Sequence, residues 1–228
     1  MSTMESKKVQ EPAATRMPAA ERRELILAAA TAVFGERGYA GATTDQVAKA
    51  AGISQPYVVR MFGTKENLFL EAMDRAMGKL FVTFRTVISE YDAGQLTTEV
   101  AALEPSLDNT RGGHLAALMG RAYADLIQDR GILLLLMQSF VSGHESVIGP
   151  RARDGFLALY EMVRDEAGLG AQHASDFLAQ GMLMNTLISL RMPEVFDSSA
   201  VANDLLKCTM KTKLDVVLAA SQAHPRIG

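Results

Sequence analysis

Apolar residues recur every three to four positions along most of this 228-residue chain, which is the spacing of amphipathic helices. No run shows the alternation and the Val, Ile and Thr content of a strand. The chain is therefore predicted to be all-α, with three short helices before residue 65 and roughly six longer ones after it. The longer helices are expected at 65–91, 113–129, 131–143, 150–167, 171–191 and 198–221, and a loop with room for a short helix at 98–104 is expected at 93–112.

The N-terminal segment predicts one helix behind a polar, flexible tail that covers residues 1–18. The helix is expected to begin near Ala19 and to run to Arg37, because Gly38 suits the left-handed residue that follows a helix end. Its buried stripe is expected to consist of Leu25, Ala29 and Val33, with Ile26 and Phe34 beside it.

Two further short helices follow, separated by a tight turn. Thr43 can cap the first of them, and Gln46 three residues later completes a capping box. Gly52 ends that helix, Ser54 is expected to cap the next, and Pro56 fits its first turn, where no amide donor is missed. The buried side of the third helix is expected to comprise Ile53, Val58, Met61 and Phe62.

Two short helices joined through a glycine turn form a helix-turn-helix, a motif that places its second helix in the major groove of DNA. Gln55 can make paired hydrogen bonds to adenine, and Arg60 can bond guanine or a phosphate. Hydroxyls and free amides at the start of the preceding helix suit a phosphate, as does a nearby lysine. The alternative is a plain three-helix core whose polar faces are only solvated. The predicted DNA-contacting residues are Thr43, Thr44, Ser54, Gln55, Pro56, Tyr57, Arg60 and Lys65.

Charge is distributed unevenly along the chain. The net charge of −3 argues against a protein that coats nucleic acid. Residues 1–65, however, contain nine Lys/Arg and six Asp/Glu, whereas residues 66–228 contain fourteen and twenty. A mildly basic head, residues 1–65, on an acidic body, residues 66–228, is typical of a DNA-reading module attached to a second unit.

The segment 22–70 resembles the DNA-binding domain of the TetR (tetracycline-repressor-like) family of transcriptional regulators. The matching stretches are RRELILAAATAVFGERGYAGATT, DQVAKAAGIS and, after the recognition helix, FGTKENLF. The resemblance covers about fifty residues closely and the remainder only as a number of helices. It implies a three-helix DNA-binding domain, 19–65, followed by a larger helical domain, 66–228, that binds a small ligand and dimerises.

One position departs from this resemblance. The family usually carries a tyrosine that contacts phosphate where this chain has Val59. Valine cannot form a hydrogen bond, so Tyr57 and Arg60 are expected to carry more of the DNA contact.

The body matches no motif of its own, and its ligand-binding role is implied by the resemblance. Met and aromatic side chains between helices can line an adaptable apolar pocket, and histidines or an asparagine can anchor a polar group in it. The alternative for each of these residues is an ordinary place in the core or on the surface; His114 and His173 are further polar candidates. The predicted ligand-binding residues are Met119, Tyr123, Met137, Phe140, His144, Phe156, Tyr160, Met182 and Asn185.

The last two long helices are the predicted dimer interface, and the resemblance implies that two helices from each subunit meet there. Residues 177–190 are apolar on nearly every side, as expected of a helix that is covered by its own subunit and by a partner. The alternative is a monomeric core. The predicted interface residues are Phe177, Gly181, Met184, Leu187, Leu206, Met210, Leu214 and Val217.

Other classes of protein are not supported. No metal-ligand motif, dinucleotide-binding loop or nucleophile–base arrangement is present, so we expect no enzyme activity, cofactor or metal. The first twenty residues lack the apolar stretch of a signal peptide, and the most apolar run, 132–137, is far below the roughly 20 residues that span a bilayer. The single Cys208 forms no internal disulfide, which fits the cytoplasm.

The chain is thus predicted to be a homodimeric, ligand-responsive transcriptional repressor. A small apolar or amphipathic effector is expected to release it from a palindromic, double-stranded operator. Three alternatives stay open: a regulator of the same fold that needs no ligand or that activates, a helical enzyme or lipid carrier with a vestigial head, and a protein-interaction module.

Overall fold

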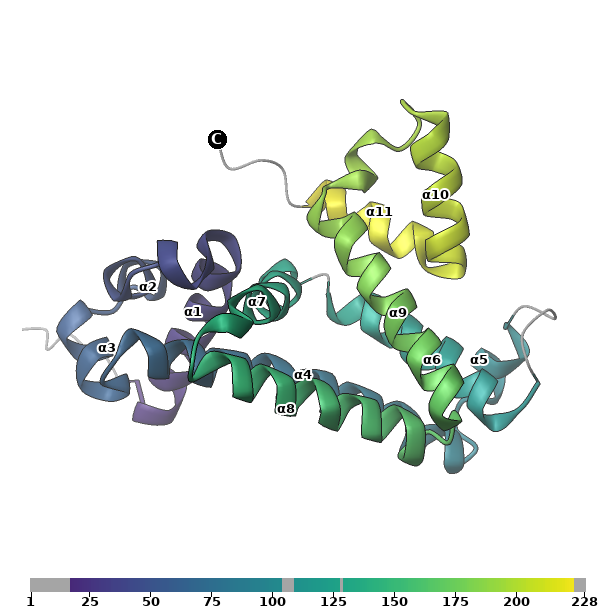
Figure 1. The fold of residues 1–228 in the computed structure, drawn as a ribbon, viewed down its shortest axis with the longest axis horizontal. Helices are drawn as coiled ribbons and strands as arrows, with labels where there is room; N and C mark the ends of the chain where they lie inside the picture. The colour runs from purple at the N-terminus through teal and green to yellow at the C-terminus, as the bar shows by residue number, and fades with distance from the viewer. Residues whose placement is uncertain (1–16, 104–108, 128, 224–228) are drawn as a thin grey trace, which may run out of the picture.

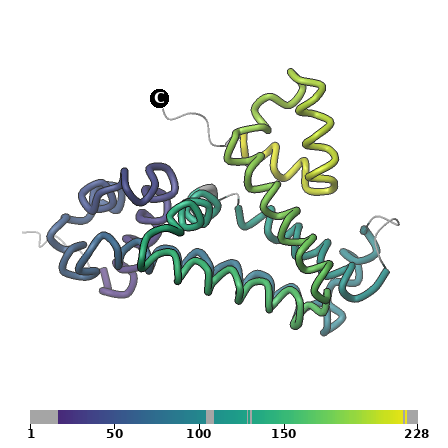
Figure 2. The backbone as a smooth tube through the Cα atoms, in the orientation of Figure 1, coloured from purple at the N-terminus to yellow at the C-terminus, as the bar shows by residue number. Residues whose placement is uncertain are grey.

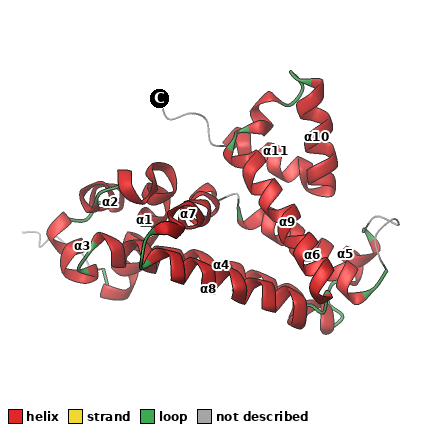
Figure 3. Cartoon of the chain, viewed as in Figure 1, coloured by secondary structure: helices red, strands yellow, loops and turns green. Residues whose placement is uncertain are grey.

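The computed structural model describes residues 17–103, 109–127 and 129–223. Within these ranges every regular element is a helix and none is a strand (Figure 3), which confirms the all-α prediction. None of the described helices is long and apolar enough to cross a bilayer. Most of the tail predicted at 1–18 lies outside the described residues. The helices are α1 (Ala19–Gly41), α2 (Thr44–Ala51), α3 (Gln55–Phe62), α4 (Lys65–Asp92), α5 (Thr97–Ala101), α6 (Arg111–Leu126), α7 (Arg130–Val141), α8 (Ile148–Glu161), α9 (Gly170–Ser189), α10 (Ala200–Met210) and α11 (Leu214–Ala223).

Local signals set the boundaries of the first three helices. Regular helix in α1 stops at Gly38, which has a φ of 68°. Thr43 Oγ1 accepts a hydrogen bond from the Gln46 amide at 3.2 Å, and Gln46 Oε1 accepts one from the Thr43 amide at 3.0 Å, so the predicted capping box is confirmed. Gly52 follows α2 with a φ of 64°. Ser54 stands at the cap position of α3, but its side chain makes no capping hydrogen bond, contrary to the prediction.

The buried stripe of α1 is displaced from the predicted one. Leu25 is 39% exposed, whereas Ile26 and Phe34 are completely buried. The helix packs against α2, α4 and α7 at once, so its buried face is broad and centred beside Leu25 instead of on it. The sequence pattern alone does not show that α7, more than 90 residues away, covers one side of α1.

One long helix, α4, runs from the head into the body (Figure 1). Thr64 caps its start by accepting a hydrogen bond from the amide at position 67. Its first half contributes Phe69 to the core of the head, where the ring meets Phe34 edge-on with 5.0 Å between centroids. Its second half contributes Phe84 to the core of the body. The same helix is therefore built into both cores.

The core of the head extends beyond the predicted division at residue 65. Buried residues of α7 and α8, Ile132, Leu135 and Ile148, belong to the same cluster as the apolar residues of α1–α3. α7 lies beside α1, and α8 lies along α4 (Figures 1 and 2). From the far end of α8 the chain returns through α9, which leads to α10 and α11 at the top of Figure 1.

The helix predicted at 198–221 is in fact two helices. Lys211 adopts a φ of 49° and ends α10, and a 3-10 turn at Lys211–Lys213 leads into α11. No glycine or proline marks this break, so the sequence carries no local signal for it. The remaining predicted helices lie within a few residues of their expected bounds, although the end of the one predicted at 150–167 is a π-helical turn at Met162–Glu166 that follows α8. α5 falls inside the segment 98–104 apart from its first residue, although position 104 lies outside the described residues.

Candidate nucleic-acid interface and internal cavity

The second helix of the motif, α3, has one exposed face. Gln55, Pro56, Val59 and Arg60 are exposed, and the second pair follows the first by about one helical turn, so all four share this face. The Gln55 side-chain amide also donates a hydrogen bond to Thr44 Oγ1 at 3.3 Å, which ties the start of α3 to the start of α2. An amide, a guanidinium and an exposed isopropyl group thus stand together on a short helix, as base reading in a major groove requires.

The side chain of Tyr57 contacts two arginines. Arg22 of α1 donates a hydrogen bond from Nη1 to the Tyr57 hydroxyl at 2.8 Å, and its guanidinium lies 5.0 Å from the ring centroid. The Arg60 guanidinium lies 4.8 Å from the same centroid. Cation–π contacts of this kind orient planar guanidinium groups. Tyr57 therefore positions a pair of cations next to the exposed face of α3, and Arg22 is a member of this cluster that the sequence pattern did not reveal.

Lys65 holds the turn between α1 and α2. Its ammonium donates hydrogen bonds to the carbonyl oxygens of Tyr39 at 2.9 Å and Ala42 at 3.3 Å, and it lies 4.6 Å from the Tyr39 ring centroid. Since a lysine ammonium has three donors, one remains for a phosphate. This structural role is additional to the DNA contact predicted for the residue.

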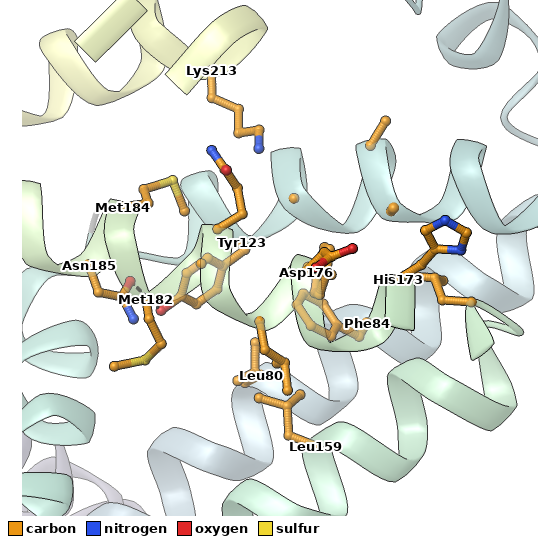
Figure 4. A pocket seen from close by; sticks show the side chains of 18 of the residues that line it. Leu80, Phe84, Tyr123, Leu159, His173, Asp176, Met182, Met184, Asn185 and Lys213 are labelled. Atoms are coloured by element: carbon orange, nitrogen blue, oxygen red, sulfur yellow. Dashed lines mark hydrogen bonds between the residues drawn. The ribbon is translucent and has the colours of Figure 1, made fainter. Parts of the chain in front are cut away.

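A cavity of about 530 Å³ lies inside the body between α4, α6, α7, α8 and α9 (Figure 4). Small-molecule sites generally measure roughly 300–1,000 Å³. Gly113, Ala116, Ala117 and Gly120 line it from α6, and these small residues leave the space open. The rest of the lining is mainly aliphatic and aromatic, including Phe84, Leu159 and Phe177.

Few polar groups reach this cavity. The Tyr123 hydroxyl donates a hydrogen bond to Asn185 Oδ1 at 2.7 Å, and both residues are buried. Burial raises the pKa of Tyr123 to about 12, so the hydroxyl stays protonated and keeps this bond. His173 and Asp176 of α9 and Lys213 of the turn after α10 also border the space (Figure 4). An apolar chamber with a few polar groups at its edge can hold an apolar or amphipathic molecule.

The helix-turn-helix head decides the affiliation of the chain. The sequence profile of the bacterial regulatory proteins of the tetR family matches residues 26–72, which reach from α1 into α4. The head of the chain is a TetR-family DNA-binding domain. The chain is a DNA-binding transcriptional regulator and not an enzyme.

Some similar proteins match more of the chain than the head. The HTH-type transcriptional activator FasR of Mycolicibacterium smegmatis is 26% identical over 180 residues, which cover 77% of this chain and 74% of FasR. The HTH-type transcriptional regulator HbdR of Aromatoleum sp. is 33% identical over 72 residues, which cover 32% of this chain and 27% of HbdR. A TetR-like transcriptional regulator from Rhodococcus sp. RHA1 has the same fold, with a TM-score of 0.53, 17% identity, and coverage of 91% of this chain and 97% of its own.

The DNA-contacting residues predicted for this TetR-family regulator are accessible. Thr43, Ser54, Gln55, Pro56 and Arg60 are exposed. The other three, Thr44, Tyr57 and Lys65, are half-buried because their side chains or rings contact neighbouring elements.

The predicted ligand-binding residues divide into two groups. Tyr123, Phe140, Phe156, Met182 and Asn185 line the cavity. The other four do not line it. Met119 is completely buried in the core and the His144 side chain is largely exposed beside Glu145, while Met137 and Tyr160 pack against the core elsewhere. The pattern of Met and aromatic residues identifies helices that face one another, but not which faces leave a space between them.

The predicted dimer residues lie mainly on the inner side of their helices. Leu187, Leu206, Met210 and Val217 are at most 3% exposed within the single chain, and Leu214 is half-buried. The other three, Phe177, Gly181 and Met184, line the cavity. The apolar residues that these helices expose are different ones, Leu183, Leu190, Val201 and Leu205. Apolar periodicity did not distinguish the inner side of each helix from the outer.

Proposed function

We propose that this regulator acts as a homodimer whose affinity for a palindromic operator is lowered by a small apolar or amphipathic molecule bound in the cavity. The observation that supports this most directly is the position of α7. Leu136 and Phe140 line the cavity from α7, and the same helix packs along α1 of the head. A ligand that favours another position of α7 would also favour another position of the head.

The contact between α7 and α1 is close enough to transmit such a shift. A Cβ atom on Gly35 would lie 3.1 Å from the carbonyl oxygen of Gly131, and one on Gly131 would lie 3.2 Å from the Cα of Ala32. Backbones in such close contact have little side-chain material between them that could absorb a displacement. α4 offers a second connection, because Leu80 and Phe84 line the cavity from the helix that continues the head.

On DNA, α3 would lie in the major groove. Gln55 and Arg60 would bond base edges. Val59 would touch a thymine methyl group, in place of the phosphate contact that a tyrosine usually makes at this position in the TetR family. Arg22, held by Tyr57, would pair with a backbone phosphate. The remaining proposed phosphate contacts are Thr43, Thr44, Ser54 and Lys65, with Pro56 packing against the backbone.

The dimer would form through the outer faces of α9 and α10. Leu183, Leu190, Val201 and Leu205 are 39–80% exposed there, and a second copy would cover them. The buried residues predicted for the interface would then support these helices from behind. Two heads related by a twofold axis would read half-sites about 34–36 Å apart or at a multiple of that distance.

Operator selection tests the DNA part of this proposal. Duplexes selected from a random pool by the purified protein should converge on a palindrome, and the dimer should bind that palindrome at physiological salt at least a thousandfold more tightly than unselected DNA, roughly the lower limit for specific binders. Equal binding to selected and random duplexes would refute the DNA-reading function.

The direction of regulation separates two candidates. The relative FasR is by name an activator, whereas we propose repression for this chain. A reporter placed behind the selected operator should be less active when the protein is expressed. Higher reporter activity would favour the activator, and would leave the reading of DNA by α3 unaffected.

A further inference from the structure

Lys213 brings a positive charge to the edge of the apolar cavity. The residue lies in the turn between α10 and α11, and its side chain extends towards α6 (Figure 4). There it passes directly over Gly120, since a Cβ atom on that glycine would lie 2.9 Å from Lys213 Nζ and 3.4 Å from Cε. Any side chain larger than hydrogen at position 120 would displace the ammonium, so the glycine and the lysine fit each other.

The ammonium has no counter-charge in the part of the chain that the structure describes. No hydrogen bond or ion pair joins it to any described residue. Burial lowers the pKa of Lys213, and the neighbouring Lys211 lowers it further. A half-buried cation with no partner among the described residues is unfavourable, and an anion at this position would satisfy it.

The other polar groups that line the cavity near Lys213 are either exposed, as Lys211 and Thr212 are, or engaged within the fold. The Asn185 carboxamide accepts from Tyr123, and Gln180 Nε2 donates to the Thr209 carbonyl at 2.7 Å. The Asp176 carboxylate accepts a hydrogen bond from the Gln172 side chain at 3.1 Å and forms no ion pair with Lys213. Lys213 is therefore the half-buried cation of the cavity lining whose bonding capacity a ligand can complete.

We propose that the cavity binds an amphipathic anion, with the apolar body of the ligand among α4, α6, α8 and α9 and its carboxylate or similar anionic group on Lys213 Nζ. This inference rests on the proposed role of the cavity as the effector site, and it adds the chemical class of the effector.

Three probes of equal chain length test the charge. Decanoate, decanol and decylamine would be titrated into the purified full-length protein by calorimetry, the two charged probes below their critical micelle concentrations and decanol below its solubility limit. Decanoate should bind about tenfold or more tightly than decanol, since a charge-assisted hydrogen bond is worth about that factor. Decylamine should bind most weakly. This comparison needs no mutant, so it stays valid if a variant fails to fold.

Two lysine variants locate the effect. Lys213→Met keeps the length of the side chain and should reduce decanoate binding to the level of decanol, while decanol binding is unchanged or improved. Lys207→Met removes the same charge from α10, where the ammonium lies 5.9 Å from the Phe196 ring centroid and not on the cavity. This control should keep the full preference for decanoate.

Several results would overturn the inference: decanol binding as tightly as decanoate, decylamine binding best, no probe binding at all, or a preference that survives Lys213→Met. Operator binding by the same preparation distinguishes a failure of the anionic-ligand proposal from a failure of the proposed function. A protein that binds its operator but prefers the alcohol refutes the anionic ligand only. A protein that binds no operator refutes the proposed function whatever the probes do.

Discussion

The head and the body of this regulator are both built from helices, but the helices pack differently in the two parts. In the head, short helices pack around rings that touch one another, and polar side chains such as Lys65 and Gln55 have partners within the fold. In the body, small residues on α6 keep a space open, and Lys213 has no hydrogen-bond or ion-pair partner in the described part of the chain. If the proposed roles hold, the surface for DNA has polar side chains already paired within the fold, whereas the ligand site keeps an open volume and an unpaired charge among the described residues.

The largest expected effect is the loss of stability when a ring is removed from the core of the head or from the core of the body. Phe69→Ala removes a completely buried ring from the head and should lower the free energy of unfolding by about 3–5 kcal/mol. Phe84→Ala should cost clearly less, because one side of that ring already borders the cavity and loses fewer contacts. Chemical denaturation of both variants measures the difference. Equal losses would mean that the body is packed as tightly as the head.

The next effect concerns DNA binding. Arg60→Ala should weaken binding to the selected operator by about 1–3 kcal/mol and leave the melting temperature nearly unchanged, because the side chain is exposed. Arg37→Ala, which removes an exposed cation of α1 outside the motif, is the matched control and should have little effect. Comparable losses from both variants would indicate that general charge, and not the face of α3, governs affinity.

A smaller effect tests the exposed valine on α3. Replacing the operator thymines by deoxyuridine one at a time removes one methyl group in each duplex. The replacement at the thymine that Val59 covers should weaken binding by about 0.8 kcal/mol. The penalty should disappear in Val59→Ala. A penalty that persists unchanged in this variant would assign the methyl contact to another residue.

The smallest expected effect is on how the free energy of unfolding depends on pH, and it comes from Lys213 in the body. Because the pKa of Lys213 is lowered on folding, the unfolded chain binds more protons than the folded one between the folded pKa and the ordinary lysine value near 10.4. Stability of the wild type should therefore rise with pH in that window. Lys213→Met should remove this rise and be more stable than the wild type below the window. Lys207→Met should keep it, and an unchanged rise in Lys213→Met would contradict the assignment.

The head was largely predictable because its signals are local. Thr43 with Gln46, and the glycines at 38 and 52, act on neighbouring residues, and the structure has them as expected. The missed features of the head depend on contacts between distant residues. α1 packs against α2, α4 and α7 on a face that lies beside Leu25, and Arg22 reaches Tyr57 across 35 positions.

The body was predictable as a set of helices but not as a site. Whether a methionine faces a cavity or a core depends on the crossing of several helices, so Met182 and Met119 look equivalent in the sequence and differ in the structure. Lys213 was not identified because the break at Lys211 that directs it inward has no local signal. The same break explains why 198–221 was predicted as one helix.

The core that spans head and body has a consequence for exchanging DNA specificity between relatives. Phe69 and Met73 of α4, with Ile132 and Leu135 of α7, fill the space behind the recognition helix. A chimera joined at residue 65 would place a foreign α4 and α7 against this head and would mismatch their shapes. A transplant that retains stability would carry two separate pieces of chain, one continuing through α4 to Ala76 and one supplying the α1-facing side of α7.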